Sequence, residues 1–230
     1  MLSNQPNDGL LLAVDGPSGT GKSTMCRALA KKLDAKYIDT GAMYRVATLA
    51  VLDAGIDPKD TDAVIAATAD LPMEVSDNPD DKAVILGGKD VSAVIRGAEV
   101  TRSVSAVAAI PEVRENLVAL QRRLAAEAHR AIVEGRDIGT VVLPEAPAKV
   151  YMTASAHVRA QRRFDQDIAA GRKVEFDQVL ADVERRDALD SSRETSPLKP
   201  ADDAVVIDTS EMTPEQVLAA LVDVIERSSK

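Results

Sequence analysis

Residues 16–23 read Gly-Pro-Ser-Gly-Thr-Gly-Lys-Ser, which fits the pattern G-x-x-x-x-G-K-[ST] of a phosphate-binding loop. The apolar run at 10–14 precedes this octapeptide and is typical of a short buried strand. Apolar or small residues then recur at helical spacing over 23–33. Strand, loop and helix are the context that the motif requires. The stretch therefore predicts a nucleotide-binding α/β fold, and a structural glycine turn is the alternative.

The expected chemistry of this loop follows from its residue types. Glycines allow positive φ, so that successive backbone N–H groups can turn inward around an anion. The N-terminus of the following helix adds the positive end of its dipole. We expect Lys22 to reach the β- and γ-phosphates of a nucleotide and the Ser23 hydroxyl to bind Mg²⁺.

The composition limits the class of protein. The chain has 230 residues, 45% hydrophobic and 28% charged, which is ordinary for one globular protein with a sizeable core. Its net charge of −9 argues against a broad nucleic-acid-binding surface. Residues 53–99 hold eleven acidic and four basic side chains, whereas 155–193 hold eight of each with the arginines grouped. Such a group is enough for a small anionic ligand.

Cysteine content and hydropathy give expectations about the compartment. Cys26 is the only cysteine, so no internal disulfide can form. We expect it to be a small buried residue, the alternative being a reactive thiol. The first residues lack the basic and apolar regions of a signal peptide, and no apolar run approaches the ~20 residues of a membrane span. We therefore expect a cytoplasmic protein with no membrane or nucleic-acid partner.

Strand-like and helix-like segments alternate along the chain, which predicts a parallel sheet flanked by helices. The predicted strands are 10–14, 36–39, 131–134, 148–154 and 204–208. The predicted helices are 22–33, 41–54, 112–129, 155–170, 176–190 and 214–227. The last helix begins at a capping box, with Thr213 as the cap, Pro214 in the first turn and Gln216 three residues after the cap.

One region interrupts the alternation. Residues 73–76 and 83–86, separated by a polar turn, predict an antiparallel hairpin, and 91–95 predict a further short strand. We expect a small sheet attached to the main fold over about 58–100.

Two further segments suit a second anionic ligand. Residues 39–45, Asp-Thr-Gly-Ala-Met-Tyr-Arg, follow a predicted strand and open a helix; a helix cap, a core aromatic and a surface arginine are the alternative. Residues 134–140, Glu-Gly-Arg-Asp-Ile-Gly-Thr, leave the carboxyl end of a strand, where open α/β sheets bind ligands. Arg136 and Asp137 are therefore candidate binding residues.

Three more charged residues share one face of a predicted helix, if that helix extends far enough. Arg186, Asp190 and Arg193 lie at i, i+4 and i+7. Two guanidinium groups around one carboxylate suit a phosphate and a ribose diol. A solvated row of ion pairs is the alternative.

Together these segments resemble the bacterial cytidylate kinases, which phosphorylate cytidine monophosphate (CMP) with ATP. The resemblance runs from about residue 10 to about residue 225. It is carried by GPSGTGKST (16–24), DTGAMYR (39–45), VAAIPEVRE (107–115), EGRDIGTVVLPEAPAK (134–149) and RRDALDSSRETSPL (185–198). It implies a P-loop kinase fold with a core at 8–57, 101–156 and 174–230, a monophosphate-binding insert at 58–100 and a helical lid at 157–173.

The resemblance also implies roles for individual residues. The ATP phosphates would be held by Gly16, Pro17, Ser18, Gly19, Thr20, Gly21, Lys22, Ser23 and Thr24. The ribose and phosphate of the acceptor would be surrounded by Thr40, Arg45, Arg136, Arg186, Asp190 and Arg193, with Tyr44 shaping the pocket. The cytosine edge would be contacted by Ser105, Arg114 and Asp137. Such a set is chemically suitable, because a carboxylate accepts from the amino group of cytosine and an arginine donates to its acceptors.

The predicted lid carries arginines for the transferring group. Arg159, Arg162 and Arg163 lie at i, i+3 and i+4, and the resemblance implies that they close over ATP. The alternative is a surface helix whose arginines pair with Asp165 and Asp167.

The implied reaction is ATP + CMP ⇌ ADP + CDP with Mg²⁺, and dCMP is expected as a second acceptor. A different P-loop kinase, for adenylate, uridylate or shikimate, is one alternative. A nucleotide-dependent switch that binds a protein partner is another, although it would not need a second anion pocket. No heptad pattern is present, so a monomer is expected.

Overall fold

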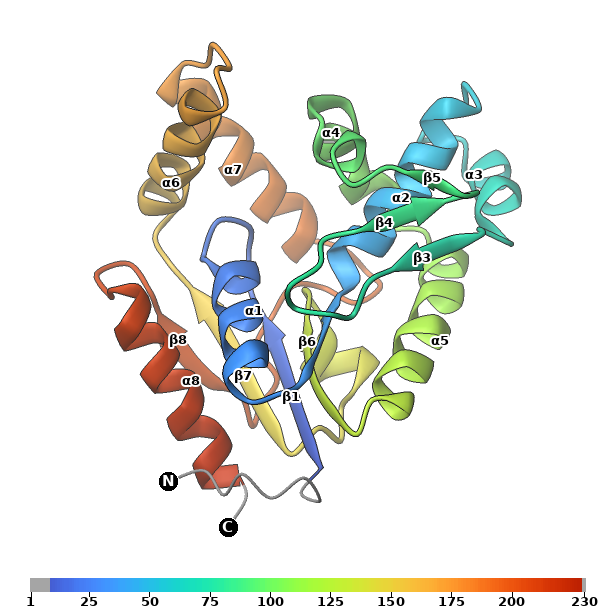
Figure 1. Ribbon diagram of the computed structural model, residues 1–230. Coiled ribbons are helices and arrows are strands. Elements are labelled where there is room, and N and C mark those ends of the chain that lie inside the picture. The colour runs from blue at the N-terminus through green and yellow to red at the C-terminus, as the bar shows by residue number, and fades with distance from the viewer. Residues whose placement is uncertain (1–8, 229–230) are drawn as a thin grey trace.

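A five-stranded parallel sheet forms the centre of the structure, a computed structural model that describes residues 9–228 (Figure 1). Its strand order is β2-β6-β1-β7-β8. The strands are β1 (Leu10–Asp15), β2 (Lys36–Asp39), β6 (Arg130–Glu134), β7 (Ala148–Thr153) and β8 (Val205–Asp208). All five predicted strands are confirmed, each within one residue at either end.

Helices cover both faces of this sheet. Leu12 and Val14 of β1 pack in one core cluster with α1 (Lys22–Lys32) and α8 (Pro214–Ser228). Ala13, whose side chain points the other way, belongs to the cluster built with α2 (Thr40–Asp53) and α5 (Pro111–Glu127). Because both faces are buried, β1 and β6 are almost continuously apolar, as parallel strands are.

The predicted helices are confirmed as well, and the start of α8 has the predicted cap. The Gln216 amide donates to Thr213 Oγ1 (3.3 Å), and the Thr213 amide donates to Gln216 Oε1 (2.8 Å). Among residues 9–228, no helix is both long and apolar enough to cross a membrane.

The insert between α2 and α5 is more helical than expected. Its sheet contains β3 (Met73–Val75), β4 (Val84–Leu86) and β5 (Lys89–Asp90). The prediction of a strand at 91–95 is wrong, because β5 ends at Asp90. The last residues of the predicted strand instead lie in a 3₁₀ turn, η1 (Val94–Arg96), in which Ile95 is buried. Two further helices were not predicted: α3 (Thr61–Thr68), within the insert, and α4 (Ala98–Val107), which leads from the insert back to the core.

Two long helices form an arm on the other side of the molecule. Helices α6 (Ala156–Ala169) and α7 (Phe176–Ser191) follow β7 and pack on each other through Ala160, Val179 and Val183. They rise beyond the carboxyl end of the sheet, opposite α4 and the insert (Figure 1). Because all five strands are parallel, the phosphate loop and the segments after β2, β6 and β7 meet at that same end.

Candidate active site

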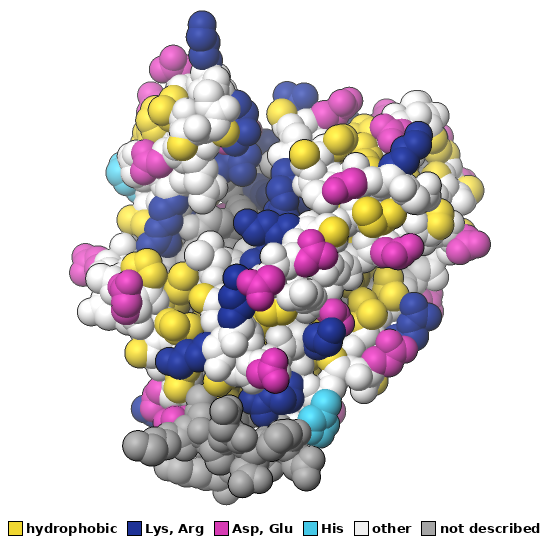
Figure 2. All heavy atoms as spheres, viewed as in Figure 1, with side chains coloured by type: hydrophobic (Ala, Val, Ile, Leu, Met, Phe, Trp, Pro, Cys, Tyr) yellow, Lys and Arg dark blue, Asp and Glu magenta, His cyan; other side chains and the backbone are white. Residues whose placement is uncertain are grey.

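One cleft opens between this arm and the insert, over the carboxyl end of the sheet. It has a volume of about 1060 Å³, at the upper end of the size of small-molecule sites. Figure 2 shows Lys and Arg side chains gathered along the walls of the hollow, although the whole chain is acidic. Every predicted site residue except Gly16, Pro17 and Thr20 lines the cleft, and these three lie in the phosphate loop.

The phosphate loop follows β1, and its glycines are required by close contacts. Gly16 has φ 141°, and a Cβ there would lie 1.9 Å from the Met152 carbonyl oxygen of β7. Gly19 has φ 83°, and a Cβ there would lie 3.0 Å from the Arg159 Cβ of α6. The loop is therefore held against the neighbouring strand and helix α6 at positions where only glycine fits.

Lys22 begins α1 and points back into the loop. Its Nζ donates to the carbonyl oxygens of Gly16 (2.8 Å) and Pro17 (2.6 Å). Burial, followed by the positive charge of Arg136, lowers the pKa of Lys22 to about 7. An ammonium group surrounded by loop carbonyls is poorly solvated, so a phosphate group would be a strongly favourable partner for it.

Ser23 reaches a buried carboxylate that was not among the predicted site residues. Its Oγ donates to Glu134 Oε1 (2.6 Å), and the Tyr37 hydroxyl donates to the same oxygen (2.6 Å). Glu134 Oε2 is buried with no hydrogen-bond partner among residues 9–228. Burial and the nearby Asp39 raise the pKa of Glu134. The available signal was an acidic residue at the end of the buried strand 130–134.

A hydroxyl beside an unsatisfied carboxylate oxygen is a donor set that suits Mg²⁺. In the described part of the chain, no group of three or more His, Cys, Asp and Glu side chains could hold a metal ion.

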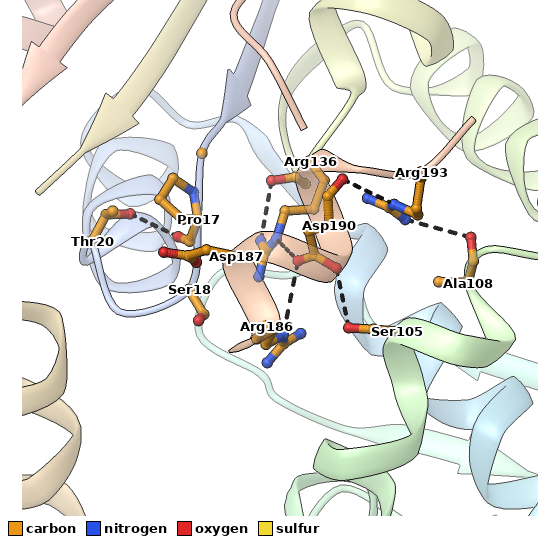
Figure 3. A network of polar contacts seen from close by, with 12 residues as sticks. Pro17, Ser18, Thr20, Ser105, Ala108, Arg136, Arg186, Asp187, Asp190 and Arg193 are labelled. Carbon is orange, nitrogen blue, oxygen red and sulfur yellow. Dashed lines mark hydrogen bonds and ion pairs between the residues drawn. The ribbon is translucent and has the colours of Figure 1, made fainter. Parts of the chain in front are cut away.

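Opposite the loop, three arginines surround Asp190 of α7 (Figure 3). Its Oδ2 lies 3.2 Å from Arg136 Nε and 3.9 Å from Arg186 Nε, and its backbone oxygen accepts from Arg193 Nε (3.2 Å). Ser105 Oγ donates to its Oδ1 (3.1 Å). Burial alone would raise the pKa of Asp190, but the arginine charges outweigh burial and the pKa is lowered. The helix ends at Ser191, so Arg193 reaches the group from beyond the helix.

These arginines carry more positive charge than their partners neutralise. Arg186 has a pKa lowered to about 9 by burial and by Arg136, and its Nε makes no hydrogen bond within residues 9–228. Arg193 Nη2 is likewise buried and unpaired in the described chain. Arg45 donates to the Ile95 carbonyl oxygen (2.8 Å) and Thr101 Oγ1 (2.9 Å), and burial and Arg96 lower its pKa to about 10. An anion would relieve this excess.

At the inner end of the cleft, Arg114 and Asp137 form a buried ion pair. The Arg114 guanidinium also lies 5.3 Å from the centre of the Tyr44 ring. The Ser105 hydroxyl, which was grouped with these two residues, is instead bonded to Asp190. Thr40 lies at the start of α2, where its hydroxyl donates to the Glu134 carbonyl oxygen (2.7 Å).

The three arginines of α6 that were expected to close over ATP differ in their contacts. Arg159 donates to the Ser18 carbonyl oxygen (3.3 Å), and Arg162 donates to the Thr209 carbonyl oxygen (2.6 Å) and, more weakly, to that of Thr20 (3.4 Å). Both therefore lie against the phosphate loop. Arg163 instead pairs with Asp167, its Nε 3.1 Å from Oδ2, as the surface-helix alternative expects for that residue.

Comparisons with known proteins show the family of the chain. The family model described as cytidylate kinase matches residues 12–227. A cytidylate kinase of Corynebacterium glutamicum is 68% identical over 98% of this chain and 98% of its own length. One of Mycobacterium avium is 55% identical over 96% and 97%. A solved structure of an uncharacterized protein from Eubacterium ventriosum, 9% identical, covers 95% of this chain and 99% of its own with a TM-score of 0.54, which indicates a shared fold.

The match thus spans the phosphate loop, the Asp190 arginines, the Arg114–Asp137 pair and helices α6 and α7. The chain belongs to the cytidylate kinase family, and its fold is that of a P-loop kinase.

Proposed function

We propose that this kinase transfers the γ-phosphoryl group of ATP to CMP and releases ADP and CDP. The names of its relatives support this substrate pair. The observation that carries the proposal is that one cleft contains both a phosphate-binding loop and a separate, under-neutralised arginine group around Asp190. A protein that bound one nucleotide as a switch would have no use for the second group.

ATP would bind with its phosphates in the loop at 16–24. The Lys22 ammonium, now bonded to the Gly16 and Pro17 carbonyl oxygens, would turn to the β- and γ-phosphates. Exchanging two carbonyl partners for charged phosphate oxygens strengthens the hydrogen bonds of a buried cation. Arg159 and Arg162, which already touch the loop, would be the nearest lid groups to the transferring phosphoryl group.

CMP would bind on the opposite wall. Arg45, Arg136, Arg186 and Arg193 would hold its phosphate and, together with Asp190 and Thr40, its ribose. The base would enter the inner end, where Asp137 can accept from the cytosine amino group and Arg114 can donate to the ring acceptors. Ser105 and Tyr44 would border that pocket. Arg114 and Asp137 would keep their ion pair and would each also hydrogen-bond the base, so the polar groups of the base and of both side chains would have partners.

The chemical step needs no side-chain base, because the attacking group is already a phosphate oxygen. That oxygen forms a bond to Pγ while the bond from Pγ to the β–γ bridging oxygen breaks and leaves its electrons on ADP. The transition state is loose, so positioning and charge neutralisation provide most of the rate. Lys22 and the lid arginines would stabilise the negative charge on the equatorial oxygens of the transferring phosphoryl group. Closure of the lid would exclude water as a competing acceptor.

We also propose that Mg²⁺ accompanies ATP and is held by the Ser23 hydroxyl and the Glu134 carboxylate. When bound, it would neutralise phosphate charge and fix the geometry of the triphosphate. The unpartnered Glu134 Oε2 supports this assignment. Tyr37, by bonding Oε1, would keep that carboxylate turned toward Ser23.

We propose dCMP as a second acceptor and pyrimidine nucleotide metabolism as the context of the reaction. The phosphate and base contacts described above do not depend on the 2′-hydroxyl.

An ADP-release assay with ATP, Mg²⁺ and a panel of acceptors tests the function. We expect CMP and dCMP to be used with a higher kcat/KM than UMP, AMP or shikimate. Preference for another acceptor would overturn the substrate assignment. Slow ATP hydrolysis that no monophosphate changes would favour a nucleotide switch over a transferase.

A further inference from the structure

Asp15 connects the two halves of the cleft, and no role in the reaction described so far uses it. It is the last residue of β1, directly before Gly16, and the residue is 3% exposed. Its Oδ1 accepts from the Ile138 amide (2.7 Å) and its Oδ2 accepts from the Gly139 amide (2.7 Å). These two residues directly follow Asp137. One carboxylate therefore joins the strand that begins the phosphate loop to the segment that carries Arg136 and Asp137.

We propose that Asp15 is a positioning residue that fixes the acceptor-binding segment 136–139 relative to the phosphate loop, and so sets the alignment of donor and acceptor phosphates. The inference rests on the proposed function. It adds to that function the residue that fixes the position of the acceptor site relative to the ATP site.

The segment needs such a partner. It begins η2 (Ile138–Val142), a short π-helical segment, and the first amides of a helix have no partner within the helix. The Asp15 carboxylate satisfies two of them at the positive end of the turn. The carboxylate packs closely on this turn, since a Cβ at Gly139 would lie 3.4 Å from Oδ2, at van der Waals contact.

A backbone hydrogen bond also joins the end of β6 to β1, but it lies before Arg136 in the chain. The Gly135 amide donates to the Val14 carbonyl oxygen (2.9 Å), which continues the pairing of β1 with β6. Beyond Gly135 the chain leaves the sheet, so backbone pairing no longer fixes it. Arg136 and Asp137 lie in that unpaired stretch, between the Gly135 contact and the two Asp15 contacts. A loss of the Asp15 contacts would therefore remove the backbone anchor next to Arg136 and Asp137, whose side chains would still pair with Asp190 and Arg114, and would leave the phosphate loop glycines in place.

Asp15→Asn tests the proposal, since asparagine keeps the size but can accept through only one oxygen. We expect the KM for CMP to rise at least about tenfold and kcat to fall about tenfold, while the Kd for ATP, measured by titration without CMP, changes less than about threefold. Hydrogen exchange in the unliganded protein should show lost protection at Ile138 and Gly139. This last measurement depends on no substrate, and if the wild type prefers another acceptor, KM is measured for that acceptor.

Two more variants make the result decisive. Asp15→Ser should give the same pattern, because its single short hydroxyl cannot accept from both the Ile138 and the Gly139 amide, and it replaces Asp15→Asn if that variant does not fold. Asp208→Asn is the matched control, because Asp208 also ends a parallel strand and accepts from a backbone amide, that of Ser210 (2.9 Å). It should leave the KM for CMP unchanged. Equal losses in ATP and CMP binding, or unchanged CMP kinetics and exchange, would overturn the proposal.

Discussion

The guanidinium of Arg159 and the carboxylate of Asp187 form a two-point ion pair beside the phosphate loop, with Nη1 3.0 Å from Oδ1 and Nη2 2.5 Å from Oδ2. Arg159 is 4% exposed and also donates through Nε to the Ala154 carbonyl oxygen (2.9 Å). Arg159 is thus held in one orientation by contacts within the protein. Its orientation depends on a residue of the neighbouring helix α7.

Asp187→Asn should therefore lower kcat without affecting acceptor binding. Asparagine cannot match both guanidinium nitrogens, so Arg159 would lose its fixed geometry, and a misplaced group in an active site costs rate. We expect kcat to fall about tenfold and the KM for CMP to stay within about twofold. Asp223→Asn, which removes an exposed ion pair with Arg227, is the control. An unchanged kcat would show that Ala154 and Ser18 orient Arg159 without Asp187.

The second prediction concerns Lys22, whose Nζ points back into the phosphate loop. Lys22→Ala should reduce kcat by at least about 10³-fold, because the charge that develops on the transferring phosphoryl group loses its nearest cation. The fold should persist, since the loop is shaped by Gly16 and Gly19 rather than by the lysine. Circular dichroism and a thermal melt check the fold. Turnover close to that of the wild type would refute the mechanism.

These two residues also show what the sequence could and could not predict. Lys22 belongs to a contiguous motif whose chemistry is local, so its place was predictable. The partner of Arg159 lies 28 residues away on another helix, and the partner of Ser23 lies 111 residues away on a strand inserted beside β1 by the sheet order. Such pairs depend on the topology, which periodicity alone does not give.

The insert shows the same limit at the level of secondary structure. Residues 91–95 are apolar enough for a strand, but Ile95 is buried by a 3₁₀ turn against α2 and β4, so tertiary packing decided the conformation. Helix α3 had a readable signal, because the Asp60 side chain caps it by accepting from the Ala63 amide (3.2 Å). The π-helical segment that begins at Ile138 had no local signal, because the partner of its first amide, Asp15, lies 123 residues away in the sequence.

The third prediction separates base recognition from ATP binding. Asp137→Asn should raise the KM for CMP about 10- to 100-fold, the cost of one or more charged hydrogen bonds, and change the KM for ATP less than about threefold. It should also destabilise the protein, because Arg114 is left as a buried charge without its counter-ion. Urea denaturation measures this loss. Equal effects on both KM values would show that Asp137 does not contact the acceptor base.

The fourth prediction concerns the proposed metal. Glu134→Gln keeps an acceptor for Ser23 and Tyr37 but removes the negative charge, so the Mg²⁺ concentration for half-maximal rate should rise about 10- to 100-fold. Saturating Mg²⁺ should restore most of kcat, and the Kd for metal-free ATP should not increase. A variant with an unchanged Mg²⁺ requirement would show that Glu134 has a structural role only.

The last prediction uses the single cysteine. Cys26 of α1 is fully buried, and burial, with the negative charge of Glu134, raises the pKa of its thiol well above the usual value. A thiol that stays protonated and covered does not attack disulfide reagents, so at pH 8 the native protein should be labelled only as fast as it unfolds, while the urea-unfolded chain is labelled fully. The unfolded thiol ionises near pH 9 and the folded one does not, so this group makes stability fall as the pH rises above 9. Cys26→Ser should flatten that part of the stability profile, and rapid labelling of the native protein would show an accessible thiolate instead.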